Sequence, residues 1–208
     1  MTEEKNLLEE LLSDGTKPTA EATAKIDFDV VAPLANEINL IQDSSVRNFV
    51  SSCLSNIDSA FWNAPMPSDE QQRPCDELEP GGIVLHTQRV TRIIYLMCEA
   101  QERSSFEKDL MLAAAILHDA TKAITNNEEF VYDSMHAYTL DSFALSRSEI
   151  LEPEFIHQIL RLIRTHLGIW SPVPETIPVT SLEWSLHIAD YVSSKMDWVL
   201  RGDTSRTQ

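Results

Sequence analysis

One apolar stretch of the chain ends in three side chains that resist burial. In Leu112–Lys122, LAAAILHDATK, a run of helix-forming apolar residues closes on adjacent His118 and Asp119, and Lys122 follows three residues later. Burying a charged group is costly unless the group is paired or bound to a metal ion. These residues therefore either lie at a helix end in water or belong to a site whose other groups compensate them.

Other residues able to bind a metal ion lie on further apolar segments. Each of them lies three or four residues from apolar side chains, and residues at that spacing share one face of a helix. His86, for example, precedes Val90 and Ile93 at this spacing. Five separate helices would thereby direct a ligand toward a common interior. In chain order, the residues are His86, His118 with Asp119, His136, His166 and Asp190.

A divalent cation would compensate all of these groups together. A single histidine on an apolar face is more often a hydrogen-bonded core residue, and Asp190 alone would equally suit an ion pair with an arginine. The occurrence of five such positions favours a metal site. The mixed nitrogen and oxygen donors suit Mn²⁺, Fe²⁺, Co²⁺, Ni²⁺ or Zn²⁺, whereas the absence of cysteine ligands argues against a structural zinc site.

The segments that carry these residues resemble the HD-domain superfamily of metal-dependent phosphohydrolases. The matching segments cover about residues 80–200: GGIVLHT (81–87), AAAILHDATK (113–122), MHAYT (135–139), IRTHLG (163–168) and HIADYVSSKMD (187–197). The resemblance implies an all-α HD-domain helical bundle with one or two divalent metal ions between its central helices. It assigns His86, His118, Asp119 and Asp190 to one metal ion, and Asp119 again, with His136 and His166, to a second.

The closest branch of the superfamily contains the HD domains of 3′–5′ exoribonucleases, and FWNAP (61–65) is similar to the start of HD proteins that include phage proteins. Three features depart from that branch. Leu167 stands where a second histidine is usual, Thr121 replaces a glycine, and no oligonucleotide-binding domain precedes the helical part. His157 and His187 match nothing in the pattern, and a structural role is expected for His187.

The implied reaction is hydrolysis of a phosphoester. Two cations about 3.5–4 Å apart lower the pKa of a shared water, and the resulting hydroxide attacks phosphorus. Asp119 suits the bridging, catalytic role because a carboxylate offers one oxygen to each ion. Lys122 would contact a phosphate oxygen, with a solvated lysine at the helix end as the alternative. Arg89, Trp62 and Trp170 are candidate substrate contacts, although core packing is the commoner role of such tryptophans.

Positioning these residues requires a helical framework. Only 5 glycines and many helix-forming residues indicate an all-α protein. Residues 171–178, SPVPETIP, are expected to be extended because proline disrupts a helix interior. Residues 63–82 form a long, proline-rich connection that is either a functional loop or a surface excursion. The apolar spacing predicts helices over about 43–60, 83–101, 106–118, 133–148, 153–167 and 180–200.

Length and composition predict a single cytoplasmic domain. In a chain of 208 residues, we expect an acidic, partly flexible segment at 1–25, one HD-type domain at 26–201 and a tail at 202–208. The acidic segment is a candidate for homo-oligomerisation. No apolar run would span a membrane, the acidic start is unlike a signal peptide, and three scattered cysteines suit a reducing cytoplasm, which would be the host's for a phage protein. The net charge of −17 makes long nucleic acid an unfavourable partner.

Three functions are compatible with these observations. The favoured one is a hydrolase that cleaves a phosphoester or phosphodiester bond of a nucleotide or short oligonucleotide, with a 3′–5′ nuclease on short single strands as its variant. The second is a non-catalytic HD module that binds a nucleotide or a partner protein, although degenerate modules usually lose ligands and all six are present here. The third is a structural helical bundle, which predicts no bound metal and little effect of Asp119→Asn.

Overall fold

The computed structural model describes residues 27, 29–67 and 73–195. The expected acidic segment at 1–25 and the expected tail at 202–208 lie outside these residues. The boundaries of the single domain, at 26–201, therefore stay a prediction.

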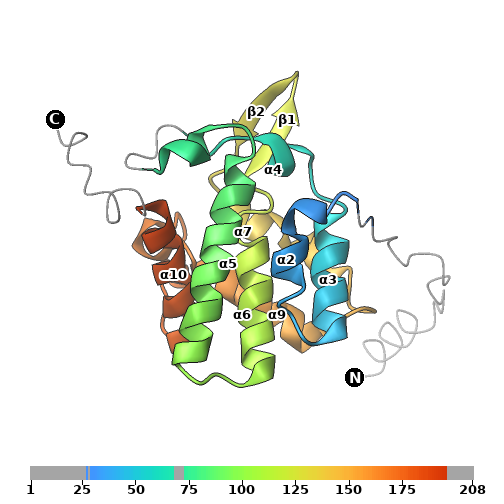
Figure 1. The fold of residues 1–208 in the computed structure, drawn as a ribbon, viewed down its shortest axis with the longest axis vertical. Helices are drawn as coiled ribbons and strands as arrows, with labels where there is room; N and C mark the ends of the chain where they lie inside the picture. Colours follow the sequence, from blue (N-terminus) through green and yellow to red (C-terminus); the bar gives the residue numbers. More distant parts are fainter. Residues whose placement is uncertain (1–26, 28, 68–72, 196–208) are drawn as a thin grey trace, which may run out of the picture.

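Four long helices form the body of the fold (Figure 1). They are α5 (Gly82–Ala100), α6 (Ser105–Leu117), α9 (Pro153–Thr165) and α10 (Ser181–Ser194). α6 packs against α5 and α9, and α10 packs against the same two helices. The predicted all-α class is confirmed, and each of these helices matches a predicted one within a few residues; the end of the predicted helix at 180–200 lies outside the described residues.

Local sequence signals set where these helices begin. At α6, the Ser104 side chain accepts a hydrogen bond from the Glu107 backbone, and the Glu107 carboxylate accepts one from the Ser104 backbone. Thr180 and Glu183 make the same pair of bonds at α10. Such a capping box satisfies backbone donors that the first turn leaves without helical partners. α9 begins at Pro153, whose fixed φ suits the first position of a helix.

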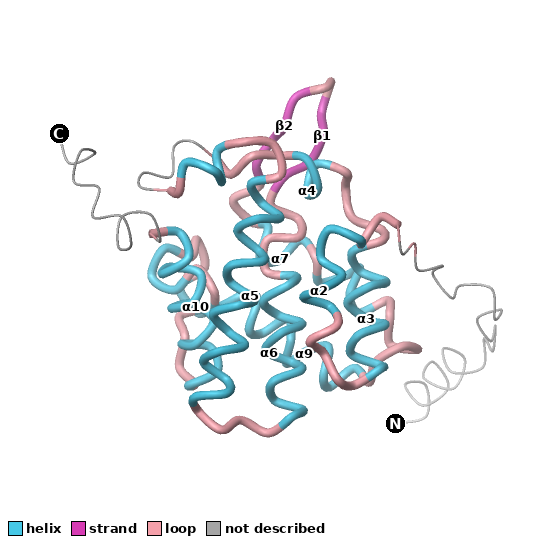
Figure 2. The backbone as a smooth tube through the Cα atoms, in the orientation of Figure 1, coloured by secondary structure: helices cyan, strands magenta, loops and turns pink. Residues whose placement is uncertain are grey.

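Shorter elements pack around the long helices (Figure 2). α3 packs against α6, and α7 and α8 pack against α9. The short helical elements are η1 (Ala32–Leu34), α2 (Ala35–Ile38), α3 (Ser44–Leu54), α4 (Ala60–Asn63), η2 (Cys75–Leu78), α7 (His136–Thr139), α8 (Asp141–Leu145), η3 (Gly168–Trp170) and η4 (Pro174–Thr176).

A β-hairpin follows α6 where no strand was predicted (Figure 2). β1 (Ala123–Asn126) pairs antiparallel with β2 (Glu129–Tyr132). The two residues between the strands, Asn127 and Glu128, both have positive φ. Two-residue hairpin turns require this backbone, and asparagine adopts it readily. The polar tip of this hairpin is therefore a local signal that the sequence analysis did not use.

Two of the predicted helices are wrong in length. The helix predicted at 43–60 ends at Leu54, because the Ser55 and Asn56 side chains bond back to carbonyls one turn earlier and compete with further helical bonds. A separate short helix, α4, follows. The expected helix at 133–148 is broken into α7 and α8. The first of these helices begins later than predicted, because Asp133 accepts a hydrogen bond from the Met135 backbone, 2.8 Å away, which forms a local turn before α7.

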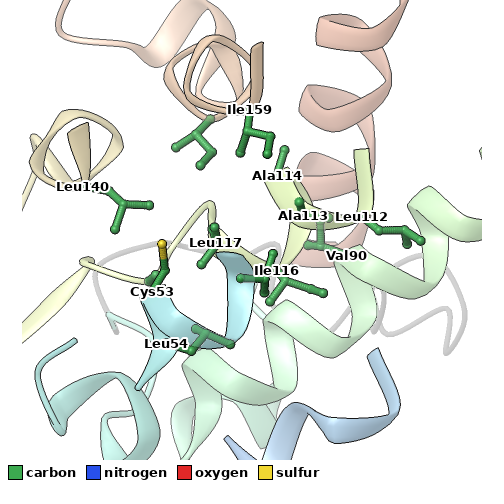
Figure 3. Close-up of a cluster of buried hydrophobic side chains, with 14 of the residues drawn as sticks. Cys53, Leu54, Val90, Leu112, Ala113, Ala114, Ile116, Leu117, Leu140 and Ile159 are labelled. Carbon is green, nitrogen blue, oxygen red and sulfur yellow. The ribbon is translucent and has the colours of Figure 1, made fainter. Parts of the chain in front are cut away.

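The apolar core surrounds α6. Every residue of α6 from Asp109 to Leu117 is buried. Figure 3 shows Ile116 and Leu117 in one buried cluster with side chains of α3, α5 and α9, among them Leu54, Val90 and Ile159. The end of α6 is thus fixed by packing on several sides. Among the described residues, none of the helices combines the length and apolar character that crossing a membrane would require.

A pair of glycines joins the 63–82 connection to α5. Gly81 has a φ of +82°, a conformation that only glycine adopts readily. A Cβ on Gly82 would lie 1.8 Å from the backbone oxygen of Glu77 and 2.9 Å from the backbone nitrogen of Met66. Met66 in turn donates a 2.7 Å hydrogen bond to the Glu77 carbonyl. The absence of a side chain at Gly82 therefore lets the connection pack directly on the start of α5.

Candidate metal centre

The structure brings the six predicted metal ligands together. They are His86 in α5, His118 and Asp119 directly after α6, His136 at the start of α7, His166 directly after α9, and Asp190 in α10. All are buried except Asp190, whose side chain is 18% exposed. His86 and Asp190 lie within long helices, as predicted. The others sit at helix ends, where a polar side chain can turn out of the apolar core.

The six side chains form two groups that share one carboxylate. His86, His118 and Asp119 can place ligand atoms within 4.8 Å of one another, and so can Asp119, His136 and His166. Asp119 Oδ2 lies 3.5 Å from His118 Nε2, while its Oδ1 lies 3.0 Å from His136 Nε2. Each carboxylate oxygen thus faces a different group.

Asp190 adds a second carboxylate to the first group. Its Oδ1 lies 2.9 Å from His86 Nε2 and 4.0 Å from His118 Nε2. The first group therefore offers two imidazole nitrogens and two carboxylates, from α5, the turn after α6, and α10.

Hydrogen bonds fix the orientation of three imidazole rings. In each ring, Nδ1 lies within hydrogen-bonding distance of a backbone carbonyl three residues earlier. A carbonyl can only accept, so Nδ1 carries the proton and Nε2 presents its lone pair to the cluster. Metal-binding histidines are commonly oriented in this way. The pairs are His118 with Ala115, His136 with Asp133, and His166 with Ile163, at 2.7, 2.8 and 2.6 Å.

The cluster contains buried acceptor atoms that the described protein atoms do not satisfy. His118 Nε2 and Asp119 Oδ1 have no hydrogen-bond partner among the described residues. His136 Nε2 and His166 Nε2 lie 3.3 Å apart with their lone pairs directed toward each other. Buried polar atoms are rarely left without a partner, and a cation would satisfy all four of these atoms. The nitrogen and oxygen donors present therefore fit a divalent metal ion.

The protonation states also suit metal binding. Burial would raise the pKa of Asp119, but Lys122 and the nearby histidines outweigh this and hold it well below its usual range. The Lys122 ammonium lies 3.2 Å from Asp119 Oδ2. Burial lowers the pKa of His118 and brings that of His166 to about 3. Near neutral pH Asp119 is therefore a carboxylate and His118 and His166 are neutral, which are the forms that bind metals. Burial alone would lower the pKa of His86, but its hydrogen bonds to Asp190 and Glu77 outweigh this and raise it.

A buried carboxylate that the sequence analysis missed lies behind His86. Glu77 is fully buried, and its Oε2 lies 3.4 Å from His86 Nδ1. Arg73 Nη1 lies 3.2 Å from the same nitrogen, and Ser193 Oγ lies 3.3 Å from it. Burial would raise the pKa of Glu77, but its bonds to His86 and Arg89 outweigh this and lower it. The 63–82 connection thus supplies an acid that orients a candidate ligand.

Arg89 supports this acid and does not contact the cluster. Its guanidinium donates hydrogen bonds to Glu77 Oε1 at 2.7 Å and to Asp76 Oδ2 at 2.6 Å. It also does not line the pocket that opens beside the cluster. The predicted substrate contact by Arg89 therefore has no support in the geometry, and the side chain stabilises a buried carboxylate instead.

A pocket of about 390 Å³ opens beside the cluster. Trp170 lines it and is 60% exposed, and its contact with substrate stays a prediction. Trp62 does not line it; its ring packs edge-on against Phe61 with centroids 4.8 Å apart, so core packing is its role. The lining residues are Arg73, Lys122, Leu167, Trp170, Asp190, Tyr191, Ser194 and Lys195.

Of the two histidines outside the ligand pattern, one supports the cluster. His187 Nδ1 lies 2.7 Å from the carbonyl oxygen of His166, to which it can donate. A Cβ on Gly168 would lie 2.4 Å from the His187 ring, so glycine is needed for this approach. The expected structural role of His187 thus includes holding the backbone of a candidate ligand. His157 is exposed on α9 and lines a different pocket.

Comparison with known proteins places this arrangement in a family. The model of the HD domain family matches residues 83–195, more than half of the chain. The chain therefore belongs to the HD domain family, which confirms the resemblance drawn from the sequence. It is also 28% identical over 122 residues to a dihydroneopterin 2′,3′-cyclic phosphate phosphodiesterase of Methanocaldococcus jannaschii. That match covers 56% of this chain and 48% of the relative, and no solved structure matches significantly.

Proposed function

We propose that this protein is a metal-dependent phosphohydrolase that cleaves a phosphodiester bond of a nucleotide or a short oligonucleotide. The proposal rests on two buried groups of candidate metal ligands that share Asp119. They lie next to a pocket lined by Lys122 and Asp190. Membership of the HD domain family supports metal binding. The name of the M. jannaschii relative supports a diester, because a 2′,3′-cyclic phosphate is a phosphodiester.

The residues of the cluster would have different roles in the reaction. One or two divalent cations, such as Mn²⁺, Fe²⁺, Co²⁺, Ni²⁺ or Zn²⁺, would be held by the six ligands and would supply Lewis-acid charge and a water of lowered pKa. Asp119 directs one oxygen to each group of ligands. Lys122 can place its ammonium against a non-bridging phosphate oxygen, where it offsets the charge that develops in the transition state.

Metal analysis combined with a substrate panel tests this proposal. Protein purified without chelator is analysed for metal content and then assayed with Mn²⁺ on nucleoside cyclic phosphates, mononucleotides and short oligonucleotides. We expect near-stoichiometric metal and turnover of a diester. Asp119→Asn should lose most of the metal and at least about 100-fold in turnover. Glu99→Gln, which removes a carboxylate from a surface pair with Lys108, serves as the matched control.

The outcomes separate the competing functions. Metal and nucleotide binding without turnover of any substrate would identify a non-catalytic HD module. Stepwise shortening of oligonucleotides, with no cleavage of small diesters, would identify a 3′–5′ nuclease. Absence of metal, together with unchanged behaviour of Asp119→Asn, would leave only a structural bundle.

A further inference from the structure

The pocket beside the candidate metal centre gathers positive charge in an acidic protein. The chain has a net charge of −17, yet the pocket lining contains Arg73, Lys122 and Lys195, with Asp190 as the one acid of that lining. The three cations come from separate elements, namely the 63–82 connection, the turn after α6 and the end of α10. Cationic side chains that converge on a concave site raise the local concentration of anionic ligands.

The positive charge is deepest next to the candidate metal centre. Arg73 and Lys122 are each only 6% exposed. Arg73 lies 3.2 Å from His86 Nδ1 and is paired with Glu77 at 3.5 Å, and Lys122 is paired with Asp119 at 3.2 Å, so both cations reach the same cluster from the pocket side. An anionic group of a ligand would therefore lie at the inner end of the pocket, and the remainder of the ligand would extend toward its mouth.

The more exposed part of the pocket lining is apolar and aromatic. Leu167, Trp170 and Tyr191 line this part. The rings of Trp170 and Tyr191 are parallel within 5°, with centroids 5.6 Å apart. Because Trp170 is 60% exposed, much of its ring remains accessible. Such a ring favours stacking with a flat ring of a ligand.

Trp170 packs against neighbouring rings of the protein. Its ring lies 5.7 Å from that of His187, which contacts the His166 carbonyl. Gly168 gives His187 the room for this contact. A side chain held in place by its neighbours loses little conformational freedom on binding, so its contacts with a ligand contribute more to affinity.

We propose that this pocket selects a mononucleotide-sized phosphodiester that carries a flat heterocyclic ring. The phosphate lies at the inner end, near Lys122 and Arg73, and the ring stacks on Trp170 beside Leu167. The inference rests on the proposed hydrolase function, narrows its substrate to a single nucleotide-sized unit and assigns recognition of the ring to Trp170. A volume of about 390 Å³ falls within the usual range of roughly 300–1,000 Å³ for small-molecule sites and suits one nucleotide unit.

Two substrates that differ only in the ring test the proposal. One is adenosine 2′,3′-cyclic phosphate, and the other is methyl riboside 2′,3′-cyclic phosphate, which has the same diester and no base. We expect the wild-type protein to prefer the first by about tenfold or more in kcat/KM, because stacking of one base contributes on that order. Trp170→Leu should abolish this preference through a higher KM for the adenosine compound, with little change for the methyl riboside.

Trp184→Leu is the matched control. Trp184 also contacts the His187 ring, at 5.6 Å between centroids, but it does not line the pocket. This variant should keep the preference for the adenosine compound. Equal losses on both substrates in Trp170→Leu would instead show that the tryptophan acts through His187, and this result would overturn the ring site.

A binding measurement separates failure of this inference from failure of the proposed function. Calorimetric titration with adenosine 3′-phosphate needs no turnover. About tenfold weaker binding by Trp170→Leu, with no hydrolysis of any substrate of the panel by the wild type, would support the ring site and overturn the hydrolase. Hydrolysis of both cyclic phosphates at the same rate by wild type and variant would support the hydrolase and overturn the ring site.

Discussion

At the residue scale, the candidate metal ligands could be predicted from the sequence, whereas the residues that orient these ligands could not. The four histidine ligands could be predicted because histidine is rare in this chain and each lies at helical spacing from apolar residues, and the family resemblance added support for Asp119 and Asp190. Glu77 and Arg73 could not be predicted in the same way. They lie in the proline-rich 63–82 connection, where no periodicity relates sequence position to direction, and this chain has many other acids. Only the fold shows that Glu77 lies behind His86.

The position of Glu77 leads to a prediction about metal affinity. Glu77→Gln keeps the size of the side chain but weakens the acceptor that faces His86 Nδ1. Loss of such a supporting carboxylate commonly costs about 10- to 100-fold in metal affinity. We expect a loss of this size when Mn²⁺ binding is measured by competition with a chelating dye.

Asp76→Asn is the control for this prediction. It removes the exposed carboxylate that pairs with Arg89 and leaves the Glu77–His86 contact in place. Its metal affinity should match that of the wild type. Wild-type affinity in Glu77→Gln would show that His86 does not need this partner.

At the scale of elements, the sequence predicted long helices better than short ones. The four long helices are recognisable because an apolar stripe repeats over several turns. The hairpin and the broken segment between Asp133 and Leu145 are set by single local hydrogen bonds and positive φ values, which leave almost no periodic trace. His136 was still predicted as a ligand, although its expected helix was wrong.

Gly82 allows a prediction about how the 63–82 connection is attached. In Gly82→Ala, the added Cβ would meet backbone atoms of Glu77 and Met66 at 1.8 to 2.9 Å, and backbone cannot yield as a flexible side chain would. We expect the free energy of unfolding to fall by about 1–3 kcal/mol or more, measured by urea denaturation. Metal affinity should fall with it, because Glu77 must shift.

Gly81→Ala provides the comparison for this variant. A Cβ on Gly81 meets only Trp62 O, at 3.8 Å, so the cost comes from positive φ alone and should be about 1 kcal/mol. Equal destabilisation by the two substitutions would show that the close packing at Gly82 is unimportant.

At the scale of the whole molecule, the net charge does not reveal the local charge of the pocket. A net charge of −17 correctly describes an acidic chain, but it gives no indication that Arg73, Lys122 and Lys195 line one pocket. These cations are far apart in the sequence and become neighbours only through the packing of α5, α6 and α10. The net charge of a chain therefore indicates which large charged partners it would repel, but it does not describe the charge within one pocket.

Metal removal is a test that involves the whole fold. A cation that binds only the folded chain stabilises it by about 2.7 kcal/mol at 100 times its Kd. For a domain of this size, addition of a chelator should therefore lower Tm by roughly 5–10 °C, as measured by calorimetry. Asp119→Asn should show no response to the chelator. An unchanged Tm in the wild type would contradict a site that is occupied in solution.

The burial of α6 divides the protein into a part that tolerates little change and a part that can vary. His118 and Asp119 continue a helix whose second half is enclosed by the core, so a mutation that moves these ligands must also disturb the packing of several helices. Leu167, Trp170 and Lys195 instead lie on turns and a helix end around the pocket. Relatives could therefore acquire new substrates by exchanging these outer residues while the reaction centre stays the same.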